Sequence, residues 1–220
     1  MRARSPSGVR TPDSGPRCSA GQEAILARMG HHGCVDADAL APEPPAGLAA
    51  LRFRVAGPGD AAALLALKEN LDRETSFMLL EPGERAVDPE DVATDLDKVA
   101  GMINSVVILA ETAGQLVGYV DARGGRFRRD RTTAHLVIGV LAAASGHGVG
   151  SQLLRELERW ALVNEIHRLE LTVMAHNRRA RQLYERAGFA VEGRRRECLL
   201  VDGHLVDELY MAKLLPRSTN

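Results

Sequence analysis

The sequence is poor in cysteine and in aromatic residues. It has three cysteines in 220 residues, Cys18, Cys34 and Cys198, and only 4% of the chain is Phe, Trp or Tyr. An odd number of widely spaced cysteines without a Cys-x-x-Cys pair argues against a disulfide framework and against a zinc ribbon. We therefore expect free thiols and a reducing compartment, the cytoplasm.

Long apolar runs and a large net charge are also missing. No segment approaches the roughly 18 to 20 apolar residues of a membrane span, and Pro and Gly interrupt the basic N-terminus before any signal-type apolar stretch. The formal net charge is -1, so no global field draws the chain to nucleic acid or anionic lipid. We expect neither a nucleic acid nor a membrane as a partner.

Residues 1–50 differ in composition from the rest of the chain. They are rich in Ala, Gly and Ser and contain Pro6, Pro12, Pro16, Pro42, Pro44 and Pro45, which predicts a mobile tail. His31, His32 and Cys34 lie close together in this segment and suggest a metal site. An exposed segment without a fourth ligand is the preferred interpretation, so we expect no bound metal.

From Leu51 onward the pattern becomes regular. Asp60 and Asp88 stand where helix N-caps belong, and Pro89 suits the first position of the second helix, which keeps its apolar spacing to Ile103. Alternating or β-branched runs predict strands at 51–55, 106–110, 116–122, 134–142 and 169–173.

The segment Ser145-Gly146-His147-Gly148-Val149-Gly150 follows one of these strands and opens a helix with an apolar side at Val149, Leu153, Leu157, Trp160 and Ala161. A helix start offers unpaired N–H groups and positive partial charge, and glycines let the backbone approach an anion closely. The loop therefore predicts a main-chain phosphate site.

The loop does not match the common nucleotide-binding motifs. Ser151 and Gln152 follow Gly150, whereas a Walker A loop needs Lys and then Ser or Thr, and the glycine spacing differs from that of a dinucleotide fingerprint. From the loop alone, a turn that binds nothing stays open as an alternative.

A second pattern, from Asn177 to Phe189, reads Asn-x-x-Ala-x-x-Leu-Tyr-x-x-x-Gly-Phe. Ala180, Leu183, Tyr184 and Ala187 share one helix face that Gly188 ends. It is followed by Glu192-Gly193 and by a hairpin over 199–214 that turns at Asp202-Gly203. With these motifs in this order, residues 51–215 resemble the GCN5-related N-acetyltransferase (GNAT) family.

The resemblance implies a mixed α/β fold with a central sheet of six to seven strands and about four flanking helices. It implies an acetyltransferase domain at 51–215, between the tails 1–50 and 216–220. It also implies acetyl-coenzyme A as co-substrate, whose pantetheine arm lies between two splayed parallel strands.

The family pattern carries over to named residues. Ser145, Gly146, His147, Gly148, Val149 and Gly150 would wrap the pyrophosphate, while Val140, Leu141 and Asn177 would contact the coenzyme. An N–H near Leu141 would polarise the thioester, and Tyr184 would be the general acid, although a packing role is its alternative. The family usually has Gln or Arg where this chain has Ser145, and neighbouring arginines or His147 could compensate.

A general base is not evident. Relatives carry Glu or His at positions matching Ala134 or Leu136, and alternation turns the intervening His135 to the other face. Glu81 and Glu84, in the loop between the first two helices, are further candidates, and so is proton loss through water.

The expected acceptor is the primary amine of a small molecule. Phe77, Met78, Leu79, Glu81, Asp207 and Tyr210 would shape its pocket, and a homodimer is expected. The alternatives are a protein N-terminal or lysine acetyltransferase, a non-catalytic acyl-coenzyme A sensor and a nucleotide-binding switch.

Overall fold

The computed structural model describes residues 50–217. The predicted tails, 1–50 and 216–220, lie outside this range except for Ala50, Pro216 and Arg217, and so do His31, His32 and Cys34. Among residues 50–217, no helix is both long enough and apolar enough to cross a bilayer.

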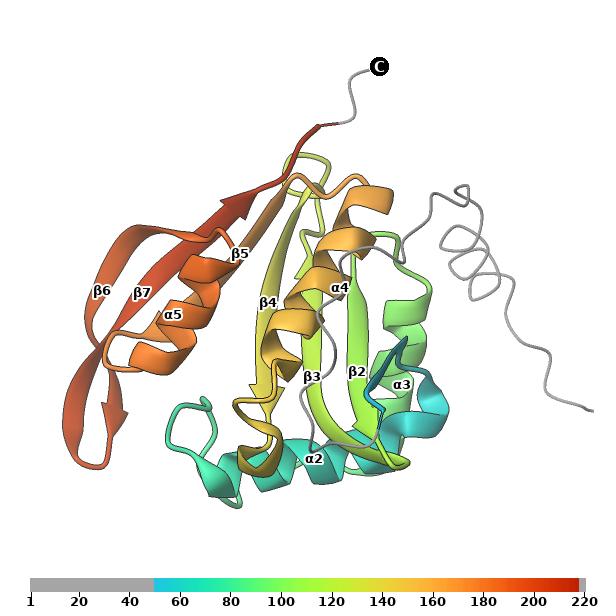
Figure 1. The fold of residues 1–220 in the computed structure, drawn as a ribbon, viewed down its shortest axis with the longest axis horizontal. Helices are drawn as coiled ribbons and strands as arrows, with labels where there is room; N and C mark the ends of the chain where they lie inside the picture. Colours follow the sequence, from blue (N-terminus) through green and yellow to red (C-terminus); the bar gives the residue numbers. More distant parts are fainter. Residues whose placement is uncertain (1–49, 218–220) are drawn as a thin grey trace, which may run out of the picture.

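The described chain forms a seven-stranded mixed sheet (Figure 1). Its strands are β1 (Arg52–Val55), β2 (Val106–Thr112), β3 (Gln115–Gly124), β4 (Thr133–Val140), β5 (Arg168–Met174), β6 (Ala190–Val201) and β7 (His204–Leu214). They lie in the order β1-β2-β3-β4-β5-β7-β6, and every neighbouring pair is antiparallel except β4 and β5.

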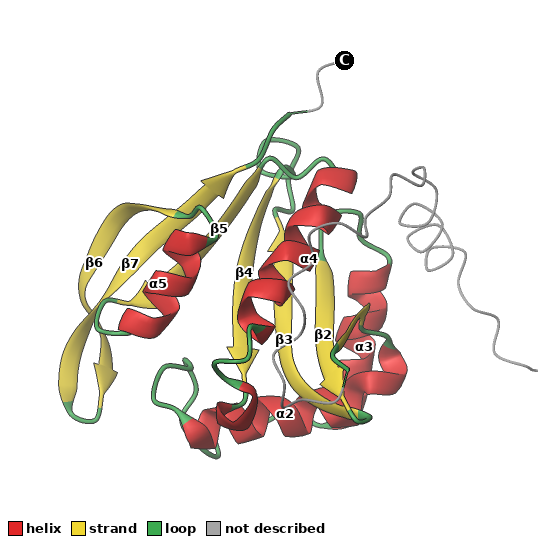
Figure 2. Cartoon of the chain, in the orientation of Figure 1, coloured by secondary structure: helices red, strands yellow, loops and turns green. Residues whose placement is uncertain are grey.

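Helices cover both faces of the sheet (Figure 2). They are α2 (Ala61–Glu74), α3 (Pro89–Ala100), α4 (Val149–Val163) and α5 (Arg178–Arg186), with short 3-10 turns at Pro58–Asp60 and Ala142–Ala144. Helices α4 and α5 pack over one core, which contains Leu153, Trp160 and Tyr184. Helices α2 and α3 pack over a second core on the other face. The predicted fold class is confirmed.

Local capping chemistry explains one helix start and corrects another. The side chain of Asp88 accepts hydrogen bonds from the N–H groups of Glu90 and Asp91, so the predicted cap of α3 is correct. Asp60 precedes α2 as predicted, but its carboxylate accepts from Arg54 and from the N–H of Gly57 instead of capping the helix. The α3 helix also stops at Ala100, short of the predicted Ile103, which is 73% exposed.

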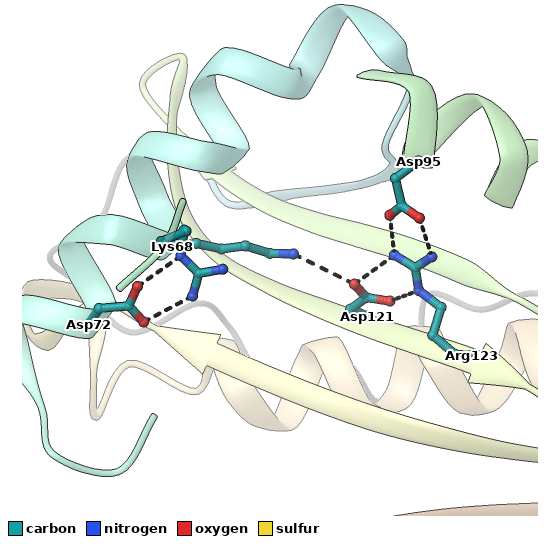
Figure 3. Close-up of polar contacts among 6 residues, drawn as sticks. Lys68, Asp72, Asp95, Asp121 and Arg123 are labelled. Atoms are coloured by element: carbon teal, nitrogen blue, oxygen red, sulfur yellow. Dashed lines mark hydrogen bonds and ion pairs between the residues drawn. The ribbon is translucent and has the colours of Figure 1, made fainter. Parts of the chain in front are cut away.

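A chain of charged side chains ties α2 and α3 to strand β3 (Figure 3). Arg123 on β3 donates to Asp95 of α3 at 2.7 and 3.0 Å and also pairs with Asp121. Lys68 of α2 lies 3.6 Å from Asp121 and 5.0 Å from the centre of the Tyr119 ring. Burial lowers the pKa of Lys68, although the nearby Asp121 acts in the opposite direction. Because charges sheltered from water need partners, these ion pairs fix the two helices on the sheet.

The parallel pair of strands is short. Hydrogen-bonded partners run only from Thr133 with Arg168 to His135 with Glu170. Beyond these pairs, β4 continues alongside β3 and β5 continues alongside β7. The two parallel strands therefore diverge toward their carboxyl ends, as Figure 1 shows.

Close packing requires a glycine at position 139 of β4, next to the point where β4 and β5 separate. A Cβ at this position would lie 2.5 Å from a Leu71 methyl carbon and 2.9 Å from the ring of Tyr119, both of which are 2% exposed. We predict that Gly139→Ala lowers the free energy of unfolding by about 1 to 3 kcal/mol through overpacking.

Denaturant unfolding measures this loss. The matched control is Gly59→Ala, because a Cβ at Gly59 meets nothing within 4 Å. Equal unfolding midpoints for the two variants would show that the packing at Gly139 is not tight.

Candidate active site

The edges of the two diverging strands present main-chain groups without strand partners. The N–H of Leu141 donates to Val117 O, and the N–H of Gly125 donates to Thr133 O, so the odd-numbered residues of β4 bond to β3. Alternation then turns the N–H groups of Ile138 and Val140 toward β5, beyond the last paired residue. The same argument, from the N–H of Ala175 donating to Asp207 O, places Thr172 and Met174 at the facing edge of β5.

This geometry refines the predicted role of the strand end. The N–H of Leu141 is engaged by Val117 O at 2.9 Å, so it is not available to a thioester. The strand ends at Val140, two residues short of the predicted Ala142, because a 3-10 turn begins there. The N–H of Ala142 donates to Glu74 Oε2 at 2.8 Å, which pins this turn to the end of α2.

The glycine segment forms the predicted turn into α4. Gly146 and Gly148 have φ values of +90° and +79°, which L side chains rarely adopt. Gly148 is the N-cap of α4 and forms no side-chain cap, so the first N–H groups of the helix have no intrahelical partner. The Nδ1 atom of His147 is buried without a hydrogen-bond partner. The turn is therefore able to donate several hydrogen bonds to an anion.

Helix α5 lies against this turn. A Cβ at Gly150 would lie 3.0 Å from a Leu183 methyl carbon, so the two helices approach closely there. Asn177 is the N-cap of α5, with its side-chain oxygen accepting from the N–H of Ala180 at 3.0 Å. That bond leaves the Asn177 amide NH₂ for other contacts.

Tyr184 of α5 is buried in the core that α4 and α5 cover. It is 6% exposed and packs on Phe189 with a ring-centre distance of 5.9 Å. Within residues 50–217 its hydroxyl makes no hydrogen bond. Burial raises its pKa above the ordinary value of 10.0, so the phenol keeps its proton at neutral pH and can donate it.

The segment between α2 and α3, residues 75–88, reaches the carboxyl end of β5. The ring of Phe77 lies 5.2 Å from that of His176, which follows β5. At its other end, Arg85 donates to Asp72 of α2 through two bonds of 2.8 and 3.0 Å. Asp72 is 4% exposed, so this ion pair anchors the segment.

An open pocket of about 500 Å³ lies between this segment and the β6–β7 hairpin. Its walls include Ser76, His176, Glu197 and Asp207. The negative charge of this lining is reduced, because Asp207 pairs with Arg194 and accepts from the N–H of Glu197 at 2.7 Å. The hydrogen bond from the Glu197 N–H has the larger effect and the bond from Arg194 the smaller one. Together they lower the pKa of Asp207 and keep it ionised.

The structure singles out none of the candidate bases. His135 is exposed while Ala134 and Leu136 are buried, so it points to the opposite face as predicted. Its register partner on β5 is Glu170, at a position where the two strands are still paired. Glu81 and Glu84 are exposed, and Glu84 accepts a hydrogen bond from the N–H of Glu81. In the described range, no group of three or more His, Cys, Asp or Glu side chains could hold a metal ion.

The sequence did not point to Glu74 or Arg179. Glu74 contacts Ala142, which is 68 residues away in the chain. The guanidinium of Arg179 lies 3.6 Å from the Cβ position of Gly146. Neither contact leaves a local signal, because each depends on how separate elements pack.

Fold and site together define a class of α/β proteins that can hold an extended, phosphate-bearing ligand between two parallel strands. The family model described as the acetyltransferase (GNAT) family matches residues 69–189, more than half of the chain. The chain belongs to this family.

Individual relatives agree with this assignment. The L-amino acid N-acetyltransferase AaaT of Escherichia coli (strain K12) is 32% identical over 105 residues, which cover 46% of this chain and 63% of AaaT. The match thus spans less than two thirds of that relative.

Solved structures cover more of the chain. A GNAT-family acetyltransferase from Streptococcus pneumoniae is 32% identical with a TM-score of 0.73 and covers 76% of this chain and 100% of its own. A ribosomal-protein-alanine N-acetyltransferase from Brucella melitensis is 29% identical with a TM-score of 0.66, covering 74% of this chain and 99% of its own.

The anchor of the segment 75–88 is open to a direct test. We predict that Arg85→Met lowers the free energy of unfolding by about 3 kcal/mol, because it leaves the Asp72 carboxylate buried without its partner. Denaturant unfolding measures the loss.

Arg73→Met is the matched control, since Arg73 is exposed and donates only to Asn70 in the same helix. Adding Asp72→Asn to Arg85→Met should recover part of the stability. A midpoint for Arg85→Met equal to that of Arg73→Met would show that the pair anchors nothing.

Proposed function

We propose that the chain is an N-acetyltransferase that moves an acetyl group from acetyl-coenzyme A to the primary amine of a small molecule. The observation that carries the proposal is the divergence of β4 and β5 directly before the glycine turn into α4. The divergence provides a slot for an extended ligand, and the glycine turn that follows β4 provides an anion site next to it. Membership of the GNAT family supports the same donor.

In this proposal the chain binds the coenzyme mainly through its backbone. The pantetheine arm pairs with the Ile138 and Val140 edge of β4 in the manner of an added strand. The segment from Ser145 to Gly150 surrounds the pyrophosphate, and Leu141 and Asn177 flank the arm and the diphosphate. No metal takes part.

The reaction is direct attack in a ternary complex. The neutral amine nitrogen bonds to the thioester carbonyl carbon, the carbon–sulfur bond breaks, and the sulfur takes a proton from the Tyr184 hydroxyl. The acylated nitrogen then loses its second proton, which returns to the Tyr184 oxygen through water. The N–H of Ile138 or Val140 polarises the carbonyl oxygen. In this proposal the ammonium proton leaves through water before the attack. Holding both reactants in one site supplies much of the acceleration.

The acceptor we propose is a small amine of the amino acid class. The pocket at the β6–β7 hairpin offers both charges, with Arg194 and Asp207 paired and Glu197 nearby. Such a lining suits a zwitterion better than a polycation. The amino acid activity in the name of the AaaT relative supports this class. A protein N-terminus is the second candidate, supported by the Brucella melitensis relative.

The remaining parts of the proposal concern the whole protein. The catalytic domain spans residues 51–215 and the tails take no part in the reaction. We propose a cytoplasmic location and a homodimer, both from the sequence expectations. Size-exclusion chromatography with light scattering measures the oligomeric state.

Turnover with an amine panel tests the function. We predict that free amino acids release coenzyme A thiol from acetyl-coenzyme A, and that Tyr184→Phe lowers kcat about 100-fold, the scale of general acid catalysis. The Kd for acetyl-coenzyme A should stay unchanged, because the phenol acts only on the departing sulfur.

Acetylation of peptide N-termini but not free amino acids would favour the second candidate. Binding of acetyl-coenzyme A with no turnover on any amine, together with no effect of Tyr184→Phe, would instead indicate a sensor. Protection against thermal unfolding by ATP or NAD, but not by coenzyme A, would contradict the proposal altogether.

The pH profile gives a separate test of Tyr184. Its raised pKa means that the phenol stays protonated at least to its ordinary value of 10.0. We predict that kcat rises with pH as the amine loses its proton and shows no descending limb below pH 10. A descending limb between pH 7 and 9 that disappears in Tyr184→Phe would contradict the raised pKa of Tyr184. A profile that is the same in wild type and Tyr184→Phe, with equal kcat, would contradict its role as the acid.

A further inference from the structure

The pyrophosphate site lacks a cation from its own loop. Position 145 is a serine, whose hydroxyl carries no charge. The loop contains no Lys or Arg, and the turn supplies N–H dipoles, the partial charge of the α4 terminus and the unpartnered Nδ1 of His147. A diphosphate carries a negative charge on each phosphate, so a cation from another element would strengthen its binding.

Arg179 of α5 is placed to do so. Its Nη2 atom lies 3.6 Å from the Cβ position of Gly146, and nothing else lies within 4 Å of that position. Leu183, one helical turn further along α5, packs against Gly150. These two contacts, four residues apart on α5 and four residues apart from Gly146 to Gly150, show that α5 lies alongside the glycine turn and the start of α4.

The guanidinium of Arg179 is not engaged elsewhere. Within residues 50–217 it makes no ion pair and no hydrogen bond. Arg181, by contrast, donates to Ala175 O at 3.2 Å and pairs with Glu185 at 3.7 Å. Arg179 is exposed, so it is free to meet a ligand from solvent.

Arg179 does not stabilise α5 through the helix dipole. It lies in the first turn of α5, which contains no acidic residue. A cation at a helix N-terminus opposes the helix dipole, whereas an anion there is favoured. A bound phosphate next to Arg179 would remove this conflict.

We propose that Arg179 supplies the cationic contact to the pyrophosphate of acetyl-coenzyme A that position 145 does not provide in this chain. The inference rests on the proposed function and assigns a binding residue within it. A guanidinium donates to phosphate oxygens through more than one N–H, so it replaces from a neighbouring helix what a loop arginine gives.

Calorimetric titration of the full chain tests the assignment. We expect Arg179→Ala to raise the Kd for acetyl-coenzyme A about tenfold, the scale of one charge-assisted contact. The matched control is Arg178→Ala, because Arg178 is the adjacent exposed arginine and has no contact with the glycine turn. It should change the Kd less than about twofold.

Coenzyme fragments separate the possible contacts. S-acetylpantetheine lacks the pyrophosphate and the 3′-phosphate, so Arg179→Ala should bind it as wild type does. The 3′-dephospho form of acetyl-coenzyme A keeps the pyrophosphate, so the tenfold penalty should persist. Adding Ser145→Arg to Arg179→Ala should restore most of the affinity for acetyl-coenzyme A.

Each contrary outcome has a distinct meaning. Equal Kd values for Arg179→Ala and Arg178→Ala overturn the inference and leave the proposed function standing. A penalty that disappears with the 3′-dephospho form moves the contact to the 3′-phosphate and overturns the pyrophosphate assignment. An equal penalty with S-acetylpantetheine shows structural damage and also overturns it. Failure of the wild type to bind acetyl-coenzyme A overturns the proposed function itself.

Discussion

The early end of the β4–β5 pairing is the constraint on which the site depends. Two parallel strands that separate after His135 leave the edges of Ile138 and Val140 without strand partners. Unpaired N–H and C=O groups inside a fold need partners, and an extended ligand can provide them. The same separation places the glycine turn of α4 beside α5, so that the slot and the anion site follow one another.

The separation is maintained by contacts on both sides. Strand β4 is held by β3 and, at its end, by Glu74 of α2 through the N–H of Ala142. Strand β5 is held by β7 along its whole length. The ion pairs around Asp121 and Asp72 then fix α2, α3 and the segment 75–88. Closing the slot would require breaking one of these sets, so it is formed before any ligand arrives.

Local signals allowed the elements and the ligand loop to be predicted. The Asp88 cap, the turn at Asp202 and Gly203, and the glycine run before Val149 each lie within a few residues. Predictions failed where residues of another element compete for the same group. Arg54 takes the Asp60 carboxylate from α2, and Val117 takes the N–H of Leu141. Arg179 could not be chosen among the arginines of α5 until that helix was seen against Gly146.

Backbone hydrogen exchange with and without acetyl-coenzyme A tests the central claim most directly. Saturating ligand should slow exchange at Ile138 and Val140, whose N–H groups face the slot. Gly139 and Leu141, whose N–H groups bond to β3, should exchange slowly in both states. If Ile138 and Val140 exchange at the same rate with the ligand bound, the coenzyme does not lie between β4 and β5.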